Sequence, residues 1–277
     1  QVVSNGCEYG FLTVYHVRAP KTNGWRPAEK VRFSLMIQVS KKSAGNQQGP
    51  VEEVPVLAGA CDRAELFRCT IQAGYAWKPP LFPRPAVTQM FLFLGAGGYV
   101  ATPTQAFSIT EPSLFVPDFD REEVAIQAGS QPLECIRIVS RMNEEDCNQI
   151  GKSHMVFPRF RPFSQAWEHT MRTIDAEGAN TRAFVLIENR KLGANNMGLF
   201  RSAQPGASKV AEDMLPTYDQ FILCLEQAGC TLWVDEEEAA LREGDIAYIP
   251  HGSRFRFECG PDGRIHHVWY TLNRAYD

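Results

Sequence analysis

The chain repeats itself at a spacing of about 132 residues, and this repeat limits what it can fold into. Residues 66–74 match residues 199–206 with one gap, and their closing glycines, Gly74 and Gly206, are 132 positions apart. Residues 91–97 match residues 223–229 at the same spacing, and residues 114–117 match residues 247–250 at a spacing of 133. Three matches within one residue of a common spacing predict two copies of one structural unit.

Each copy contains short apolar or alternating segments separated by Gly and Pro turns, which is typical of an all-β sandwich or barrel. Residues 11–17 and 31–39 also alternate, and we expect them to add strands to the first copy. Two stretches favour a helix: residues 163–172, with Ser164 as a candidate cap, and a turn at residues 143–146 capped by Asn143. We therefore predict an N-terminal barrel with extra strands over residues 1–148 and a C-terminal barrel over residues 149–277.

The most specific motif closes the second copy at residues 243–252. It has a Gly-Asp turn, a short apolar strand and a Pro-x-Gly turn, with Gly244, Pro250 and Gly252 at its characteristic positions. With the duplication, it resembles the second signature motif of the cupin superfamily over about residues 56–277. The resemblance implies a bicupin, an all-β protein of two tandem cupin barrels (double-stranded β-helix, or jelly roll). The layout is also similar to that of ureidoglycine aminohydrolase, a manganese bicupin of comparable length, including the turn at residues 205–207.

Metal-dependent cupins are expected to hold their ion with three His and one Glu in the barrel mouth, and both copies lack this set. The position of the last His carries Glu122 in the first copy and Phe255 in the second. We therefore predict no metal ligands of the usual kind and no cofactor. A rearranged site for Mn, Fe, Ni or Zn stays open, with ligands drawn from the nearby oxygen and imidazole groups: Glu212, Asp213, Asp219, Gln220, His266 and His267.

Aromatic and polar side chains are expected to meet at the barrel mouths, which is the usual form of a small-molecule site. The candidate acids and bases are Tyr218, His267 and Glu122. The candidate ligand-binding residues share an expected position on the inner face or rim of a barrel: Gln220, Trp233 and Trp269 in the second copy, Arg84 and Gln89 in the first. The alternative is that the aromatic residues simply fill the barrels, as in many small barrels.

Composition narrows the range of partners. The net charge of −4 and the lack of a basic run argue against nucleic acid, and no apolar stretch approaches the length of a membrane span. None of the eight cysteines forms a C-x-x-C pair, so we expect buried free thiols and a cytoplasmic protein. Three functions stay open: a small-molecule enzyme, a non-catalytic ligand-binding bicupin, or a structural bicupin. We expect a small-molecule ligand and a homodimer formed through edge strands.

Overall fold

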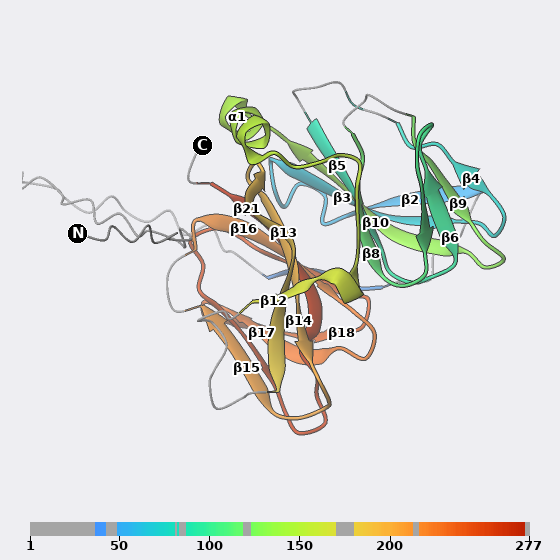
Figure 1. Cartoon of the computed structure of the whole chain (residues 1–277). Coiled ribbons are helices and arrows are strands. Elements are labelled where there is room, and N and C mark those ends of the chain that lie inside the picture. The colour runs from blue at the N-terminus through green and yellow to red at the C-terminus, as the bar shows by residue number, and fades with distance from the viewer. Residues whose placement is uncertain are drawn as a thin grey trace, which may run out of the picture. The chain divides into compact units, whose positions relative to one another are not determined.

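The structure is a computed structural model that describes residues 37–42, 49–80, 82, 87–118, 123–169, 180–212 and 216–274 (Figure 1). All described residues lie in one compact unit of the chain, Met36–Asp277.

The first copy forms a barrel of two facing antiparallel sheets, which we call the first barrel. A six-stranded sheet has the order β11-β8-β5-β10-β3-β2, and a four-stranded sheet has the order β4-β9-β6-β7. Their inner faces share one apolar core, which includes Phe91, Phe115 and Ile126. The strands are β2 (Val51–Val56), β3 (Ala64–Ile71), β4 (Ala76–Trp77), β5 (Val87–Phe93), β6 (Gly98–Ala101), β7 (Ala106–Ile109), β8 (Ser113–Val116), β9 (Ala125–Ala128), β10 (Leu133–Arg141) and β11 (Arg159–Pro162).

The second copy forms a matching pair of sheets, which we call the second barrel. Its large sheet has the order β1-β19-β16-β21-β14-β13-β12 and its small sheet the order β15-β20-β17-β18. The all-β prediction of two barrels is confirmed by this arrangement. The strands are β1 (Gln38–Ser40), β12 (Trp167–His169), β13 (Thr181–Leu192), β14 (Asn195–Ser202), β15 (Ser208–Glu212), β16 (Tyr218–Cys224), β17 (Gly229–Val234), β18 (Glu237–Arg242), β19 (Ile246–Ile249), β20 (Phe255–Cys259) and β21 (His266–Asn273).

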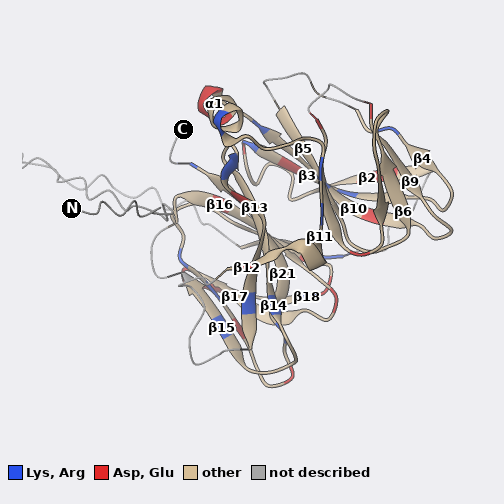
Figure 2. Cartoon of the chain, in the orientation of Figure 1, with Lys and Arg blue, Asp and Glu red and all other residues tan. Residues whose placement is uncertain are grey.

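One of the two predicted helices forms. Helix α1 (Glu144–Ser153) starts at Asn143, whose side chain accepts a hydrogen bond from the Asp146 amide, while Asp146 accepts one from the Asn143 amide. This capping box and the acidic first turn, red in Figure 2, stabilise the helix start. The helix predicted at residues 163–172 is wrong over its described part. It is a single 3₁₀ turn, η1 (Phe163–Gln165), followed by β12, because backbone pairing with β13 outweighs local helix preference.

Two short strands join the sheet of the other copy. Strand β1 pairs with β19 of the second barrel, with Gln38 opposite Tyr248. Strand β11, which follows α1, pairs with β8 of the first barrel. The expectation that residues 31–39 add to the first barrel is therefore wrong for Gln38 and Val39, while residues 11–17 and 31–36 lie outside the described residues. The boundary at residue 148 stays a prediction.

The outer faces of the two large sheets share a second apolar core. It contains Leu66, Leu92 and Ile138 from the first barrel, with Phe221 and Tyr270 among those from the second. Tyr248 also belongs to this core, whereas Phe115 lies in the core of the first barrel. The sequence match that aligned these two residues is therefore off by one position, since a shift of one residue reverses the face of a strand.

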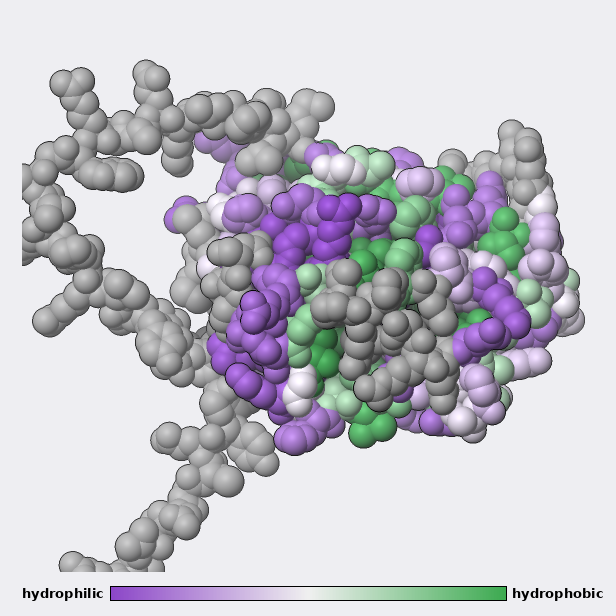
Figure 3. All heavy atoms as spheres, turned by 90° about the horizontal axis from the view of Figure 1, so that it is seen from above, coloured by the Kyte–Doolittle hydropathy of each residue, from purple (hydrophilic) through white to green (hydrophobic). Residues whose placement is uncertain are grey.

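No helix in the described part of the chain has the length and hydropathy that a membrane span requires. On the face shown in Figure 3, patches of hydrophilic and of apolar residues lie beside one another on the described surface.

Candidate functional site

The first barrel contains a cavity of about 240 Å³ over the inner face of its large sheet. Strand alternation produces this lining, because β3 and β10 each turn every second residue inward. The lining residues are Arg63, Ala64, Glu65 and Phe67 from β3 and the segment before it, Phe82, Val87 from β5, and Arg137, Val139 and Arg141 from β10. Cys69 and Cys135 continue the same faces into the apolar core. The cavity is thus the open end of the barrel interior.

Arg137 is the most enclosed cation of this lining, with 6% of its surface exposed. Its Nε lies 2.7 Å from Glu53 Oε1, as an ion pair without the alignment of a hydrogen bond. Its guanidinium carbon stands 4.4 Å from the centre of the Phe67 ring, in a cation–π contact. The buried Nη1 has no hydrogen-bond partner among the described residues. A fixed guanidinium with an unused donor therefore stands at the cavity wall.

Gln89 lies beside this cavity and is 5% exposed. It shares a face of β5 with Val87 and pairs across the sheet with Val139, and both of these line the cavity. Neither Oε1 nor Nε2 of its side chain has a partner among the described residues. Because each buried polar atom left unpaired costs about 1–3 kcal/mol, this amide is expected to meet a ligand or water.

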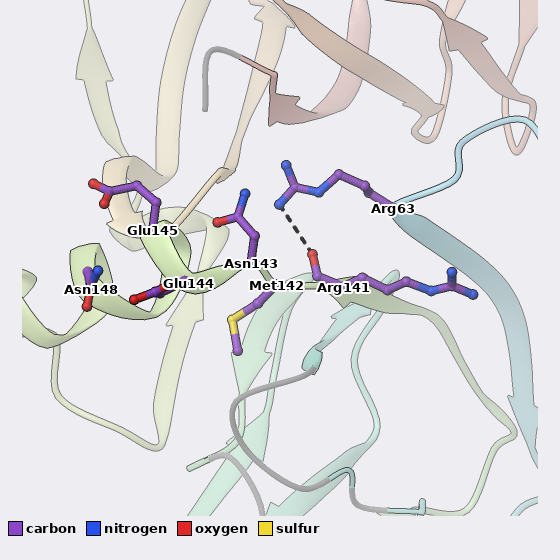
Figure 4. A pocket seen from close by; sticks show the side chains of 7 residues that line it. All are labelled: Arg63, Arg141, Met142, Asn143, Glu144, Glu145 and Asn148. Atoms are coloured by element: carbon purple, nitrogen blue, oxygen red, sulfur yellow. Dashed lines mark hydrogen bonds between the residues drawn. The ribbon is translucent and has the colours of Figure 1, made fainter. Parts of the chain in front are cut away.

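Arg63 and Arg141 line both the cavity and a neighbouring surface hollow, which is also lined by the start of α1 (Figure 4). Arg63 donates to the Arg141 carbonyl oxygen at 3.4 Å and pairs with the buried Asp146. Asp146 also accepts a hydrogen bond from the Ala194 amide at 2.7 Å, and it thereby links α1 to the second barrel. Arg141 is exposed and pairs with Glu65 at 3.4 Å. The rim of the cavity is therefore held by residues from both copies.

The corresponding space in the second barrel is filled by Trp269. Trp269 lies directly opposite Gly198, as Arg137 lies opposite Phe67 in the first barrel. A Cβ atom on Gly198 would lie 2.3 Å from Cζ2 of the indole, so the ring lies against the glycine backbone. Trp269 is 9% exposed and belongs to the core of this barrel. The alternative that aromatic residues fill a barrel therefore fits Trp269.

His267 is fully buried inside the second barrel. Its ring centre lies 4.4 Å from that of Phe257 and 5.3 Å from that of Phe200, and neither ring nitrogen has a partner among the described residues. Burial, with a smaller contribution from the charge of His266, lowers the pKa of His267 to about 3. The imidazole is therefore neutral at neutral pH and enclosed by aromatic rings.

The other predicted residues are scattered. Tyr218 is half-buried against the core of the second barrel, and Gln220 is 3% exposed, with an Oε1 that has no partner among the described residues. The inward orientation expected for Trp233 is wrong. Trp233 lies on the outer face of β17, under the Arg256 guanidinium at 4.3 Å, because alternation turns Leu232 and Val234 inward. Glu122 and Arg84 lie outside the described residues. The roles predicted for these residues stay predictions.

Asp219, a candidate oxygen ligand for a rearranged metal site, accepts hydrogen bonds from other residues. It lies on the outer face of β16 and accepts hydrogen bonds from Tyr248 Oη at 2.6 Å, from the His251 amide at 3.1 Å and from Arg274. Burial would raise the pKa of Asp219, but these hydrogen bonds outweigh burial and lower it. Within the described ranges, no three His, Cys, Asp or Glu side chains are grouped to hold a metal ion. Asp213 and the side chain of Glu212 lie outside those ranges.

Three residues of this site were not predicted from the sequence: Arg137, Phe67 and Glu53. A signal was present, because alternation along β10 places Arg137 on the same face as Cys135 and Val139. An arginine in the middle of a strand that is otherwise buried is uncommon and needs a partner.

Comparison with known proteins supports the fold. No protein-family model and no curated protein sequence matches the chain. The chain is similar to the structure of a putative glyoxylate-induced protein from Pseudomonas aeruginosa, with a TM-score of 0.70 and 10% identity over 92% of this chain and 96% of that one. It is also similar to protein YlbA from E. coli (TM-score 0.63, 9% identity, 86% and 88% coverage). A third similar structure is the oxalate decarboxylase of Lactobacillus farciminis in its formate complex (TM-score 0.56, 11% identity, 82% of each chain).

These neighbours are cupin proteins, and identities near 10% establish the fold alone. The predicted resemblance is confirmed at that level: this chain has the bicupin fold.

Proposed function

We propose that this bicupin binds a small polar metabolite in the cavity of its first barrel, and that its second barrel supports the fold. The observation that carries the proposal is the unpaired amide of Gln89 beside a cavity of about 240 Å³. In the second barrel, Trp269 occupies the corresponding space. Ligand pockets for drug-sized molecules usually have about 300–1,000 Å³, so this cavity suits a smaller metabolite.

The cavity lining favours holding a ligand without a metal ion. It presents Arg63, Arg137 and Arg141, whose positive charges would repel a divalent cation. Glu65 is the one carboxylate among the lining residues that the structure describes, and it pairs with Arg141. Guanidinium and amide groups suit the recognition of polar atoms on a ligand.

A thermal-shift screen of sugars, amino acids and ureides tests this proposal. A ligand at 100 times its Kd stabilises the folded state by about 2.7 kcal/mol, which corresponds to roughly 5–10 °C in Tm for a chain of this size. The variant Val139→Phe places a larger side chain in the cavity and is expected to abolish the shift. Val156→Phe is the matched control and is expected to keep the shift, because it makes the same change at a residue that is 77% exposed and does not line the cavity. A ligand that stabilises Val139→Phe as strongly as wild type would place binding elsewhere and refute the proposal.

A further inference from the structure

The guanidinium of Arg137 is held in place before any ligand arrives. Phe67 supports one face of the group at 4.4 Å, and Glu53 lies 2.7 Å from its Nε. The Arg137 side chain is 7% exposed, whereas that of Glu53 is 29% exposed, so the cation is the more enclosed partner. A group that is fixed in advance loses little conformational entropy on binding, which favours ligand recognition at this position.

The free capacity of Arg137 determines what kind of ligand atom fits. A guanidinium carries five N–H donors and no acceptor. Nη1 of Arg137 is buried and has no hydrogen-bond partner among the described residues, and Glu53 occupies only the Nε side. The missing partner must therefore supply an acceptor. A carboxylate matches best, because its two oxygens fit the guanidinium fork and its charge makes each hydrogen bond stronger.

The surrounding charges permit an incoming anion. Glu53 and Asp146 pair with Arg137 and Arg63, and neither carboxylate lines the cavity. Glu65 does line it, but its side chain is 56% exposed and its contact with Arg141 is 3.4 Å, so a ligand can displace it at low cost. The cavity lining thus contains three arginines, and its described carboxylate, Glu65, pairs with Arg141 and not with Arg137.

From these contacts we infer that the ligand of the first barrel carries a carboxylate, which the guanidinium of Arg137 binds. The inference rests on the proposed function and makes it more specific. The amide of Gln89, on the neighbouring strand, then hydrogen-bonds a second polar group of the same molecule. The ligand class is a small organic acid with one further polar substituent.

Titration calorimetry with matched pairs of probes tests the inference. The pairs are pyruvate with pyruvamide, and benzoate with benzamide, each at up to about 10 mM, in which the carboxylate is replaced by a neutral amide of similar shape. At least one acid is expected to bind wild type about ten-fold more tightly than its amide. Arg137→Met keeps an apolar stem over Phe67 and is expected to lower the affinity for that acid by about 30-fold or more. Arg137→Lys keeps the positive charge without the guanidinium fork, and its affinity for the acid is expected to lie between those of wild type and Arg137→Met.

Arg182→Met is the matched control, because it removes an exposed arginine and its ion pair with Glu168 from the second barrel. Its affinity for the acid is expected to equal that of wild type. Circular dichroism and Tm of each variant show whether it is folded, and Arg137→Lys maintains the test if Arg137→Met does not fold.

Three outcomes overturn the inference: an amide that binds as tightly as its acid, an acid that binds Arg137→Met as tightly as wild type, or no binding by any acid. The variant Val139→Phe separates this failure from that of the proposed function. If a neutral compound binds wild type but not Val139→Phe, the cavity is a binding site and only the carboxylate assignment is wrong.

Discussion

Replacing His267 with leucine is expected to stabilise the protein. The imidazole is fully buried against Phe200 and Phe257, and neither nitrogen has a partner among the described residues. Removing buried polar atoms that lack partners is expected to raise the free energy of unfolding by about 1–3 kcal/mol at pH 7. For a chain of this size, that corresponds to an increase in Tm of roughly 2–12 °C.

The advantage of the leucine variant should grow as the pH falls. The pKa of His267 is about 3 in the folded protein and ~6.5 in the unfolded chain. Between these values the unfolded state binds a proton and the folded state does not, so lowering the pH favours unfolding. From pH 7 to pH 5 this linkage removes about 2 kcal/mol of stability from the wild type and nothing from the leucine variant.

Urea denaturation at pH 7 and pH 5 measures both effects. The control His267→Asn keeps a buried polar side chain but does not titrate. It should therefore lose the pH dependence without the stabilisation at pH 7. Groups that titrate elsewhere cancel when each variant is compared with wild type at the same pH. If His267→Leu were less stable than wild type at pH 7 and had the same pH dependence, the reasoning would be refuted, because His267 would then have a partner or access to water.

Four other predictions follow from the described contacts. Asp219→Ala breaks a buried pair with Arg274 and should lower the free energy of unfolding, measured by urea denaturation, by about 3–5 kcal/mol. Since the pKa of Asp219 is lowered, the stabilising effect of its carboxylate should be full above pH ~4 and disappear at lower pH. A decrease in the free energy of unfolding below about 1 kcal/mol would contradict this prediction. Gln89→Leu should raise the free energy of unfolding by about 1–3 kcal/mol and abolish ligand-induced stabilisation, and a variant that still binds would exclude the amide from the site. Elemental analysis should find no stoichiometric Mn, Fe, Ni or Zn, and a metal that is lost in His266 and His267 variants would refute a metal-free site. Light scattering should find a homodimer, since β12 is an edge strand with Trp167 55% exposed, and a monomer would contradict this.

The sequence by itself determined the architecture. The two copies, the strand pattern and the Gly244 to Gly252 motif depend on local chemistry: alternation of apolar residues, turns that need Gly or Pro, and the spacing between matches. The cap at Asn143 belongs here too, because a capping box involves residues only three positions apart. Such features can be recognised without knowing which strands become neighbours.

Only the tertiary structure decided where the described residues enclose a cavity. Arg137 and Trp269 occupy corresponding places, but one pairs with Phe67 and leaves a cavity, while the other covers Gly198 and fills the space. Both outcomes depend on the register between strands that are distant in sequence, and a shift of one residue would turn each side chain to the other face. For the same reason, the partner of β1 did not follow from local patterns. Contacts between distant strands therefore set the candidate site, because they determine which side chains face each other across a barrel.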